Sequence, residues 1–412
     1  MFVVRPASML VREERLFWGV DVLPTLPRAL GLALIGAVSF VVGYELRVGR
    51  RLAVRLPAPR PVHSRLAAAS AFVTAGIAVG TLLILLPVSE GLDSLRILVS
   101  GRSAEFGELL QTSTYITNGS FLLVPAAIVL VGLAIRDRTP LLLGAAAIVL
   151  TLALARVAPA GGRIVMLPLI GSVFVLAYVM RDRRPSPAVL ATVGLLALVG
   201  SYLTLAVRDP TDRMTVRTAV EQLGDRPQAV LDPVIRSADA EMVLALSAAL
   251  TIVPDELQHR WGDATIGNLV TRPVPREWWP RKPLPPSETV VAKLWPDLYP
   301  GLNPAFSPLL VLYWDFGIAG VAVGMALFGL LWRVFYEWFL LHRRAFAAQL
   351  LFASGLWFVV IGARNDPVDT IVLGAFLFMP VLGIVAVASE GVLVGQRARG
   401  KPTWSGEPNK TP

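Results

Sequence analysis

The sequence contains no cysteine and only three histidines among 412 residues. The lack of cysteine excludes disulfides and thiol catalysis, and says nothing more about the compartment. HExxH and DxD metal patterns are absent, as are the P-loop, GxSxG and dinucleotide-binding glycine patterns. We therefore expect no metal site and no resident cofactor.

Charge is also scarce, at 16% of residues, whereas soluble proteins carry roughly 25%. Hydrophobic residues make up 55% of the chain and the mean hydropathy is +0.63. These values indicate a polytopic membrane protein. The net charge of +9 does not point to nucleic acid, because most of the excess lies in short loops between apolar runs, as the positive-inside rule requires.

Apolar runs long enough to cross a membrane, which takes roughly 20 residues, occur about nine times. We predict an all-α polytopic membrane protein with about nine (8–11) transmembrane helices and one large external loop that contains short helices. The basic connections after the odd-numbered spans belong in the cytoplasm, which puts the N-terminus outside. The predicted spans are 27–44, 66–87, 120–135, 141–157, 164–180, 188–207, 309–334, 347–361 and 370–388.

The chain divides accordingly into five parts. Residues 1–26 are a mixed N-terminal segment without a cleavable signal peptide, and their abrupt start leaves open that an earlier part precedes them. Spans one to six fill 27–207, and spans seven to nine fill 309–388. Between them, 208–308 form the large extracytoplasmic loop, with short helices expected at 213–224, 232–252 and 256–269. We expect residues 389–412 to form a disordered cytoplasmic tail.

One stretch, 272–317, which covers the end of the loop and the start of the seventh span, combines cations, tryptophans and many prolines. Proline stiffens a loop, so that cations on it are held in position. Arginine forks match phosphate oxygens in pairs, and tryptophan suits both the membrane interface and the face of a sugar ring. The stretch contains Arg272, Arg276, Arg281, Lys282, Trp278, Trp279 and Trp295.

Arginines recur in the other outer connections as well. Each by itself is explained by snorkelling to lipid headgroups, but short outer loops disfavour basic residues, so the set together predicts an anion-binding site. Nucleotide donors are not available in bulk outside the membrane, so a lipid-linked pyrophosphate is the natural anion there. Arginines could stabilise the negative charge of the pyrophosphate leaving group without a metal. The predicted substrate-binding residues are Arg102, Arg163, Arg208, Arg276, Lys282, Arg364, Trp278 and Trp279.

A base that activates a hydroxyl nucleophile would complete such a site. Among the external acidic residues we single out Asp315 and Glu288 as catalytic candidates. Asp315 lies where an apolar helix begins, at YWDFG, and the simpler interpretation is that it is a plain helix N-cap.

Two motifs carry a resemblance to a known family. VPREWWPRKP (274–283), near the end of the large outer loop, and LYWDFGIAGVAVG (312–324) resemble the Wzy-type O-antigen polymerases, which join oligosaccharide repeat units. GGRIVMLPLI (161–170) is similar to the arginine-led helix start of that family. The asparagine that the family has before the phenylalanine is Asp315 here, and the place where the family often has an acid is Val311.

The resemblance implies a multi-pass enzyme of the cell membrane that transfers a growing glycan between polyprenyl-pyrophosphate-linked oligosaccharides. The implied reaction is metal-independent and inverting, with Arg163, Arg276, Lys282 and Arg364 holding pyrophosphates or orienting sugars. A chain-length regulator and a flippase are the implied partners, besides the lipid bilayer. Three other functions stay open: an O-antigen-ligase-like transfer to another acceptor, a lipid-linked sugar transporter or flippase, and a non-enzymatic scaffold.

Overall fold

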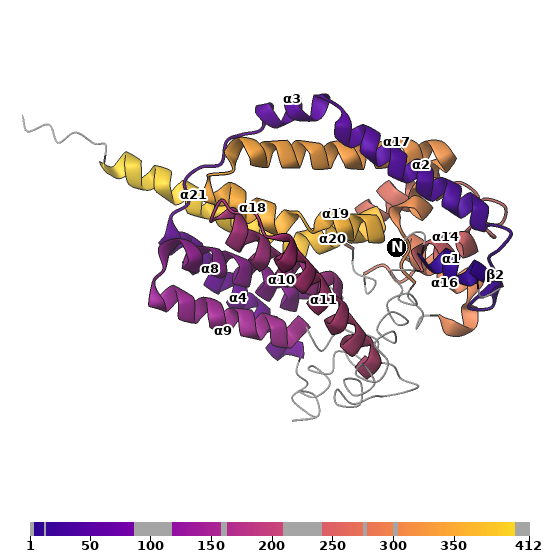
Figure 1. The fold of residues 1–412 in the computed structure, drawn as a ribbon, viewed down its shortest axis with the longest axis horizontal. Coiled ribbons are helices and arrows are strands. Elements are labelled where there is room, and N and C mark those ends of the chain that lie inside the picture. Colours follow the sequence, from indigo (N-terminus) through magenta and orange to yellow (C-terminus); the bar gives the residue numbers. More distant parts are fainter. Residues whose placement is uncertain are drawn as a thin grey trace, which may run out of the picture.

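The computed structural model describes residues 4–11, 14–85, 118–157, 163–208, 241–274, 278–299 and 304–399. Helices make up nearly all of the regular structure in these ranges (Figure 1). The strands found there are the short antiparallel pair β1 (Leu16–Phe17) and β2 (Val20–Asp21). The predicted all-α class is confirmed.

Six helical stretches in the described residues are long and apolar enough to cross a membrane. Proline begins several of them, at a position where its missing N–H is not needed. They are α2 (Leu26–Glu45), α4 (Ser64–Leu85), η1 (Ser120–Leu122) with α8 (Leu123–Asp137), α9 (Pro140–Val157), α17 (Pro308–His342), and α18 (Phe346–Gly355) with α19 (Phe358–Arg364). The structure is thus that of a helical polytopic membrane protein.

The remaining predicted spans are helical as well. α20 (Pro367–Leu377) and α21 (Met379–Arg399) form a pair bent by 41°, which would make a seventh crossing if it acts as one span. α10 (Arg163–Val179) and α11 (Pro187–Arg208) agree closely with the spans predicted at 164–180 and 188–207, and the apolar stretches found among their described residues are Val165–Val179 and Pro187–Leu196. α21 continues to Arg399, so the first part of the segment expected to be a disordered tail is helical instead.

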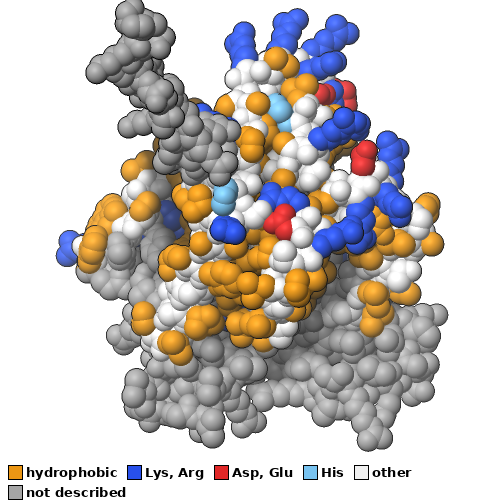
Figure 2. Space-filling model, turned by 90° about the vertical axis from the view of Figure 1, so that its left-hand side faces the viewer, with side chains coloured by type: hydrophobic (Ala, Val, Ile, Leu, Met, Phe, Trp, Pro, Cys, Tyr) orange, Lys and Arg blue, Asp and Glu red, His pale blue; other side chains and the backbone are white. Residues whose placement is uncertain are grey.

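One end of the molecule, called here the basic end, collects the arginine-rich connections. The Arg136 guanidinium, at the end of α8, donates to Ser64 Oγ at the start of α4 and lies 4.1 Å from the ring centre of Phe346 at the start of α18. The amphipathic helix α3 (Val48–Arg55), which the sequence interpretation did not anticipate, follows α2. Figure 2 views this end and shows Lys and Arg side chains gathered there with few acidic ones. The positive-inside rule predicts that this end faces the cytoplasm.

The opposite end, called here the loop end, is built from the large loop and the N-terminal segment. Ser247 of α14 (Met242–Ala249) donates to the Val22 carbonyl, and the Trp295 indole donates to the Trp18 carbonyl, at 2.9 Å each. Trp295 follows α16 (Pro286–Leu294) and begins the turn η4 (Pro296–Leu298). Residues 14–26, together with α1 (Val4–Val11), are therefore packed against the described part of the large loop (Figure 1).

The short helices expected in the loop are only partly matched. Of the helix expected at 232–252, residues 232–240 lie outside the described residues and the rest contains α14, which ends at Ala249. The helix expected at 256–269 is a π-helical turn, η3 (Asp263–Gly267), followed by α15 (Asn268–Thr271). The helix expected at 213–224 lies outside the described residues. α16 was not predicted, although Pro286 at its start and Glu288 in its first turn are typical helix-start residues.

α17 is the longest helix, and it is interrupted near its start. Phe316 and Gly317 leave helical geometry, and Gly317 takes φ +63° and ψ −150°, a conformation that in practice only glycine adopts. The break separates a short buried first part, which belongs to the loop end, from a second part of about 25 residues that is long enough to span about 30 Å.

Candidate functional site

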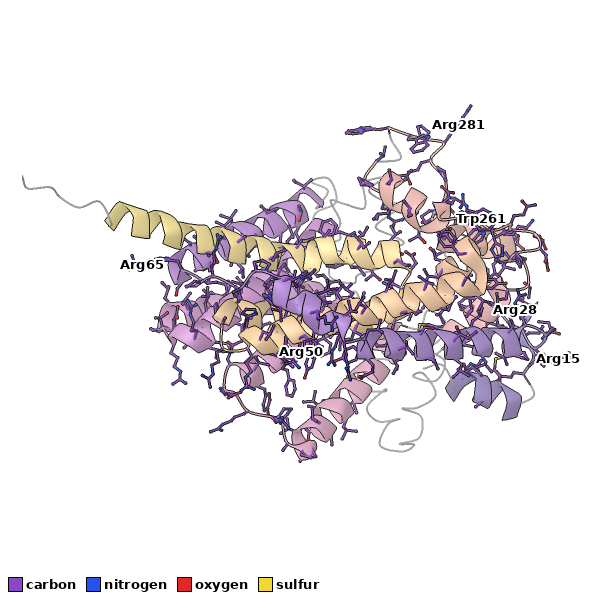
Figure 3. The ribbon with its side chains drawn as sticks, turned by 90° about the horizontal axis from the view of Figure 1, so that it is seen from above. Arg15, Arg28, Arg50, Arg65, Trp261 and Arg281 are labelled. Carbon is purple, nitrogen blue, oxygen red and sulfur yellow. The ribbon has the colours of Figure 1, made fainter. Side chains whose placement is uncertain are left out.

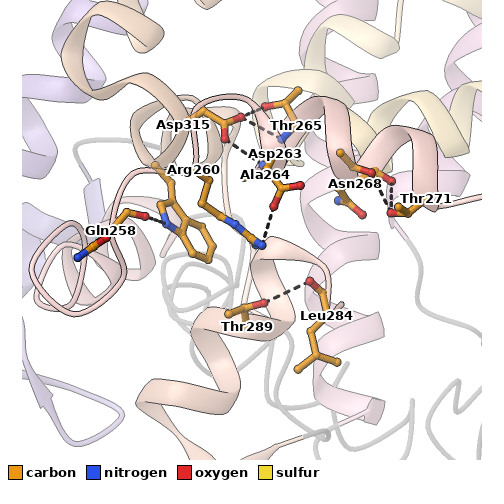
Figure 4. Close-up of polar contacts among 12 residues, drawn as sticks. Gln258, Arg260, Asp263, Ala264, Thr265, Asn268, Thr271, Leu284, Thr289 and Asp315 are labelled. Carbon is orange, nitrogen blue, oxygen red and sulfur yellow. Dashed lines mark hydrogen bonds and ion pairs between the residues drawn. The ribbon is translucent and has the colours of Figure 1, made fainter. Parts of the chain in front are cut away.

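The break in α17 is wrapped by residues 258–265 of the large loop (Figure 4). The backbone N–H groups of Arg260 and Trp261 donate to the carbonyls of Trp314 and Asp315, each at 3.1 Å. The Trp314 indole donates in return to the Gln258 carbonyl at 3.0 Å. The loop is thus bound to the helix at the point where the helix has lost its own backbone hydrogen bonds.

Asp315 is the centre of this arrangement. Its side chain is fully buried, and its carboxylate accepts the N–H groups of Ala264 and Thr265 at 2.9 Å each and the Thr265 hydroxyl. It does not cap its own helix, which begins at Pro308 after the N-cap Ser307, so the N-cap interpretation was wrong in that form. Instead it caps η3 from a distant part of the chain, since those N–H groups belong to the first turn of η3.

An ion pair connects the proline-rich stretch to the turn between α19 and α20. Arg272 Nη2 lies 2.7 Å from Asp369 Oδ1. Asp366, the N-cap of α20, accepts the Asp369 N–H at 2.9 Å and is almost fully buried. The Lys282 ammonium donates to the carbonyls of Arg272 and Val274, at 3.1 and 2.9 Å, and so joins two parts of the proline-rich stretch. We call Arg272, Lys282, Asp366 and Asp369 the latch.

Asp366 lies outside the membrane-spanning helices, and its environment makes its carboxyl easy to protonate. Burial raises its pKa to about 7, and the neighbouring Asp369 carboxylate acts in the same direction. The Asp369 N–H and the Arg272 guanidinium oppose this rise. Because the pKa of Asp366 is higher in the folded protein than its ordinary value of 3.8, its protonated form stabilises the fold. This contribution to the free energy of unfolding is complete below pH 3.8 and is lost as the pH rises through about 7.

Replacing Asp366 with asparagine should therefore make the protein less sensitive to pH. Asparagine keeps an oxygen for the Asp369 N–H but carries no charge. We expect the melting temperature in detergent at pH 8 to rise by at least ~2 °C relative to the parent, with little change at pH 5. Asp297→Asn, an exposed acid of η4, is the control and should keep the parent's pH dependence. Equal pH dependence in parent and Asp366→Asn would contradict the assignment.

The described backbone brings Arg163 and Arg364 to the same end of the molecule. Gly171 of α10 packs on the Trp357 ring, whereas Leu176 and Leu350 both meet at Gly132, so α10 and the α18–α19 pair run antiparallel. From the Gly171–Trp357 contact, Arg163 and Arg364 each lie about two helical turns further in the same direction. The Arg272–Asp369 ion pair places the proline-rich stretch at this end too.

The structure describes the other predicted site residues only in part. Arg364 donates to Asn365 Oδ1 at 2.9 Å, and Trp278 is 83% exposed, with Trp279 partly so. Glu288 is exposed in the first turn of α16, with its carboxylate 3.5 Å from the Tyr299 hydroxyl. Arg102 and Arg276 lie outside the described residues, as do the side chains of Arg163 and Arg208. Figure 3 shows Arg281 and Trp261 at the loop end with Arg15 and Arg28, away from Arg50 and Arg65.

Two residues at this end were not predicted as site residues from the sequence. Asp369 was overlooked although Asp366, Pro367 and Asp369 form a recognisable helix-start pattern. Arg156 was overlooked because it closes an apolar run; its guanidinium donates to Ser120 Oγ at 3.0 Å and lies 5.3 Å from the ring centre of Phe121. Within the described ranges, no three His, Cys, Asp or Glu residues are grouped in a way that could hold a metal ion.

Comparisons of the chain with protein-family models, with curated proteins and with solved structures found no match.

Proposed function

We propose that this protein is a glycosyltransferase of the cell membrane that polymerises polyprenyl-pyrophosphate-linked oligosaccharide repeat units at the outer face. In this proposal α10 and α11 also complete crossings, which gives about nine spans. The observation that carries the proposal is the common end shared by Arg364, the start of α10 at Arg163, and the tryptophan-bearing proline-rich stretch. The same end is opposite the basic, cytoplasmic one, as an enzyme acting on exported lipid-linked sugars requires.

The proposed reaction is an inverting transfer. An acceptor hydroxyl attacks the anomeric carbon of the donor glycan, the bond from that carbon to the pyrophosphate oxygen breaks, and the electron pair leaves on the pyrophosphate. Arginine forks at Arg163, Arg276 and Arg364 would stabilise the charge on this leaving group. Lys282 already donates two backbone hydrogen bonds, so its contribution is to hold the loop as well as to add positive charge.

The two acidic candidates have different surroundings. Glu288 is exposed, so in this proposal it is the base that takes the hydroxyl proton. Asp315 has no solvent-exposed surface and accepts three hydrogen bonds, which favours a role in holding the loop in place. Trp278 and Trp279 would provide ring faces for the sugars.

Deleting the gene and analysing lipid-linked intermediates tests the proposal. We expect surface polymer to disappear and single repeat units to accumulate on the lipid carrier. If long lipid-linked polymer accumulates instead, the protein is a ligase, and if the repeat units stay on the cytoplasmic side, it is a transporter.

Complementation with variants tests the arginines. Arg163→Ala and Arg276→Ala should abolish polymer at unchanged protein level, and lysine at either place should restore only part of it, because the fork is lost. Arg15→Ala, which removes an exposed arginine paired with Asp21, is the control and should restore polymer fully. Long-chain polymer in both alanine variants would refute the catalytic role of the arginines.

A further inference from the structure

The turn of the large loop that packs against the α17 break has an unusual distribution of polar and apolar groups. The N–H groups of Ala264 and Thr265 point inward and bond to Asp315, and the Thr271 hydroxyl bonds within the turn to the Gly267 carbonyl at 2.9 Å. Its large apolar side chains point outward, with Trp261 77%, Ile266 64% and Val270 70% exposed. A loop in water would show the opposite arrangement.

The exposed residues share one face. Ile266, Leu269 and Val270 have the i, i+3, i+4 spacing that places side chains side by side on a helical turn. Trp261 enters the turn with φ +52° and is followed by Gly262 at φ +97°, a pair of left-handed residues that reverses the chain here. We call Trp261, Ile266, Leu269 and Val270 the apolar ledge.

The ledge is continuous with the exposed apolar surface of α17. The Trp261 and Phe316 rings are 6.4 Å apart at 70°, and Phe316 and Ile318, at the break, are themselves exposed. Below them, exposed apolar residues recur every fourth position of the span, at Val323, Leu327 and Leu331. Since that stripe belongs to a candidate membrane span, the surface that continues it reaches the same lipid.

The charges beside the ledge fit this position. Arg260 and Asp263 pair with each other at 2.6 Å, and the Arg260 guanidinium lies 5.4 Å from the Trp314 ring centre. The pair neutralises both charges close to the ledge. Tryptophan beside a charged pair, with aliphatic side chains beyond it, is the composition of a segment at the boundary between headgroups and acyl chains.

We propose that the apolar ledge is inserted into the outer leaflet, where acyl chains of the bilayer cover it. The insertion fixes the height of the loop above the membrane, because Asp315 ties the ledge to the α17 break and the Arg272 end of the same turn is held by Asp369. The latch residues are thereby kept at the level of the headgroups. This inference does not depend on the proposed enzymatic activity.

Single-cysteine labelling tests the inference directly, because the chain contains no cysteine. Ile266→Cys and Val270→Cys in the full-length protein are labelled with an environment-sensitive nitrobenzoxadiazole probe and reconstituted into phosphatidylcholine bilayers. Leu327→Cys on the lipid-facing stripe and Arg281→Cys on the exposed proline-rich stretch are the matched references. Variants are compared only if they melt within the parent's range.

We expect the probes at 266 and 270 to be shielded from water, like the one at 327, but to lie nearer the headgroups. Their emission should be blue-shifted, quenched at least two-fold by lipids carrying a shallow nitroxide, and insensitive to aqueous iodide. The probe at 281 should show the reverse. Quenching by iodide at 266 and 270 would overturn the inference, as would a blue shift insensitive to both quenchers, which would mean that protein covers the ledge.

Discussion

Replacing Gly329 with alanine should prevent the protein from folding normally, although the same change elsewhere in a helix is favourable. A Cβ atom at Gly329 would lie 2.0 Å from the carbonyl oxygen of Phe40, and one at Gly43 would lie 1.9 Å from that of Ala326. α2 and α17 therefore touch backbone to backbone, and no side-chain movement can make room. Close contacts of this kind through small residues are a common way for membrane helices to associate.

The expected loss exceeds about 3 kcal/mol, because overpacking that only backbone movement can relieve lies at or above the upper end of the usual range. Thermal melting in detergent and the yield of membrane-inserted protein are the measurements. Gly31→Ala on α2 is the matched control, since a Cβ there meets no atom within 4 Å. It should leave stability unchanged or raise it by up to about 1 kcal/mol, as alanine favours helix. If Gly329→Ala and Gly31→Ala melt alike, the two helices do not approach so closely.

The contact has a consequence for the candidate site. α17 carries the break, Asp315 and the start of the loop end, and the same hydrophobic core contains Leu26 and Leu32 of α2. A change of the α2–α17 distance would therefore displace the residues that hold the large loop. Variants at Gly43 and Gly329 should lose polymer formation together with stability, whereas Arg163→Ala should lose polymer alone.

Helix positions could be predicted from the sequence, whereas helix partners could not. The first span was expected at 27–44 and is Leu26–Glu45, because a run of apolar residues determines a crossing by itself. This span lies along α17 because Gly43 and Gly329 allow the two helices to approach closely. The sequence around either glycine does not indicate which other helix it will contact. The packing of residues 14–26 against α14 was hidden for the same reason, since it depends on side-chain contacts such as Ser247 to Val22.

For the candidate site, the residue types could be recognised from the sequence, but the contacts that these residues make could not be predicted. The proline-rich stretch stood out by composition, and Arg272 and Lys282 within it do take part in the latch. Their partners are a carboxylate nearly a hundred positions away and two backbone carbonyls, neither of which composition can reveal. Asp315 shows the limit most clearly: its place near a helix opening suggested a local cap, while the N–H groups it accepts belong to another segment.

Asp315→Ala should release the loop from the α17 break while the spans remain folded. The change leaves the Ala264 and Thr265 N–H groups and the Thr265 hydroxyl without their acceptor, and each buried donor left unpaired costs about 1–3 kcal/mol. Residues 258–271 then lose their main attachment, so trypsin should cut after Arg260 at least ten-fold faster than in the parent, whereas the bond after Arg272 is protected by Pro273 in both. Mass spectrometry of the fragments identifies the cut sites, and Asp263→Asn, which removes only a surface ion pair, is the control.

The same residue lets the anchoring role be separated from a catalytic one. Asp315→Asn keeps the side-chain size but turns an amide N–H₂ toward backbone N–H donors. If Asp315 acts as an anchor for the loop, this variant should lose polymer and should also be cut faster by trypsin. A general base would instead lose polymer with unchanged cutting. Asp315→Glu sharpens the distinction, because it keeps a carboxylate for proton transfer but is too long for a site buried against η3. Across the three variants, polymer loss that follows the tryptic rate supports anchoring, and polymer loss without a change in that rate would make Asp315 the base.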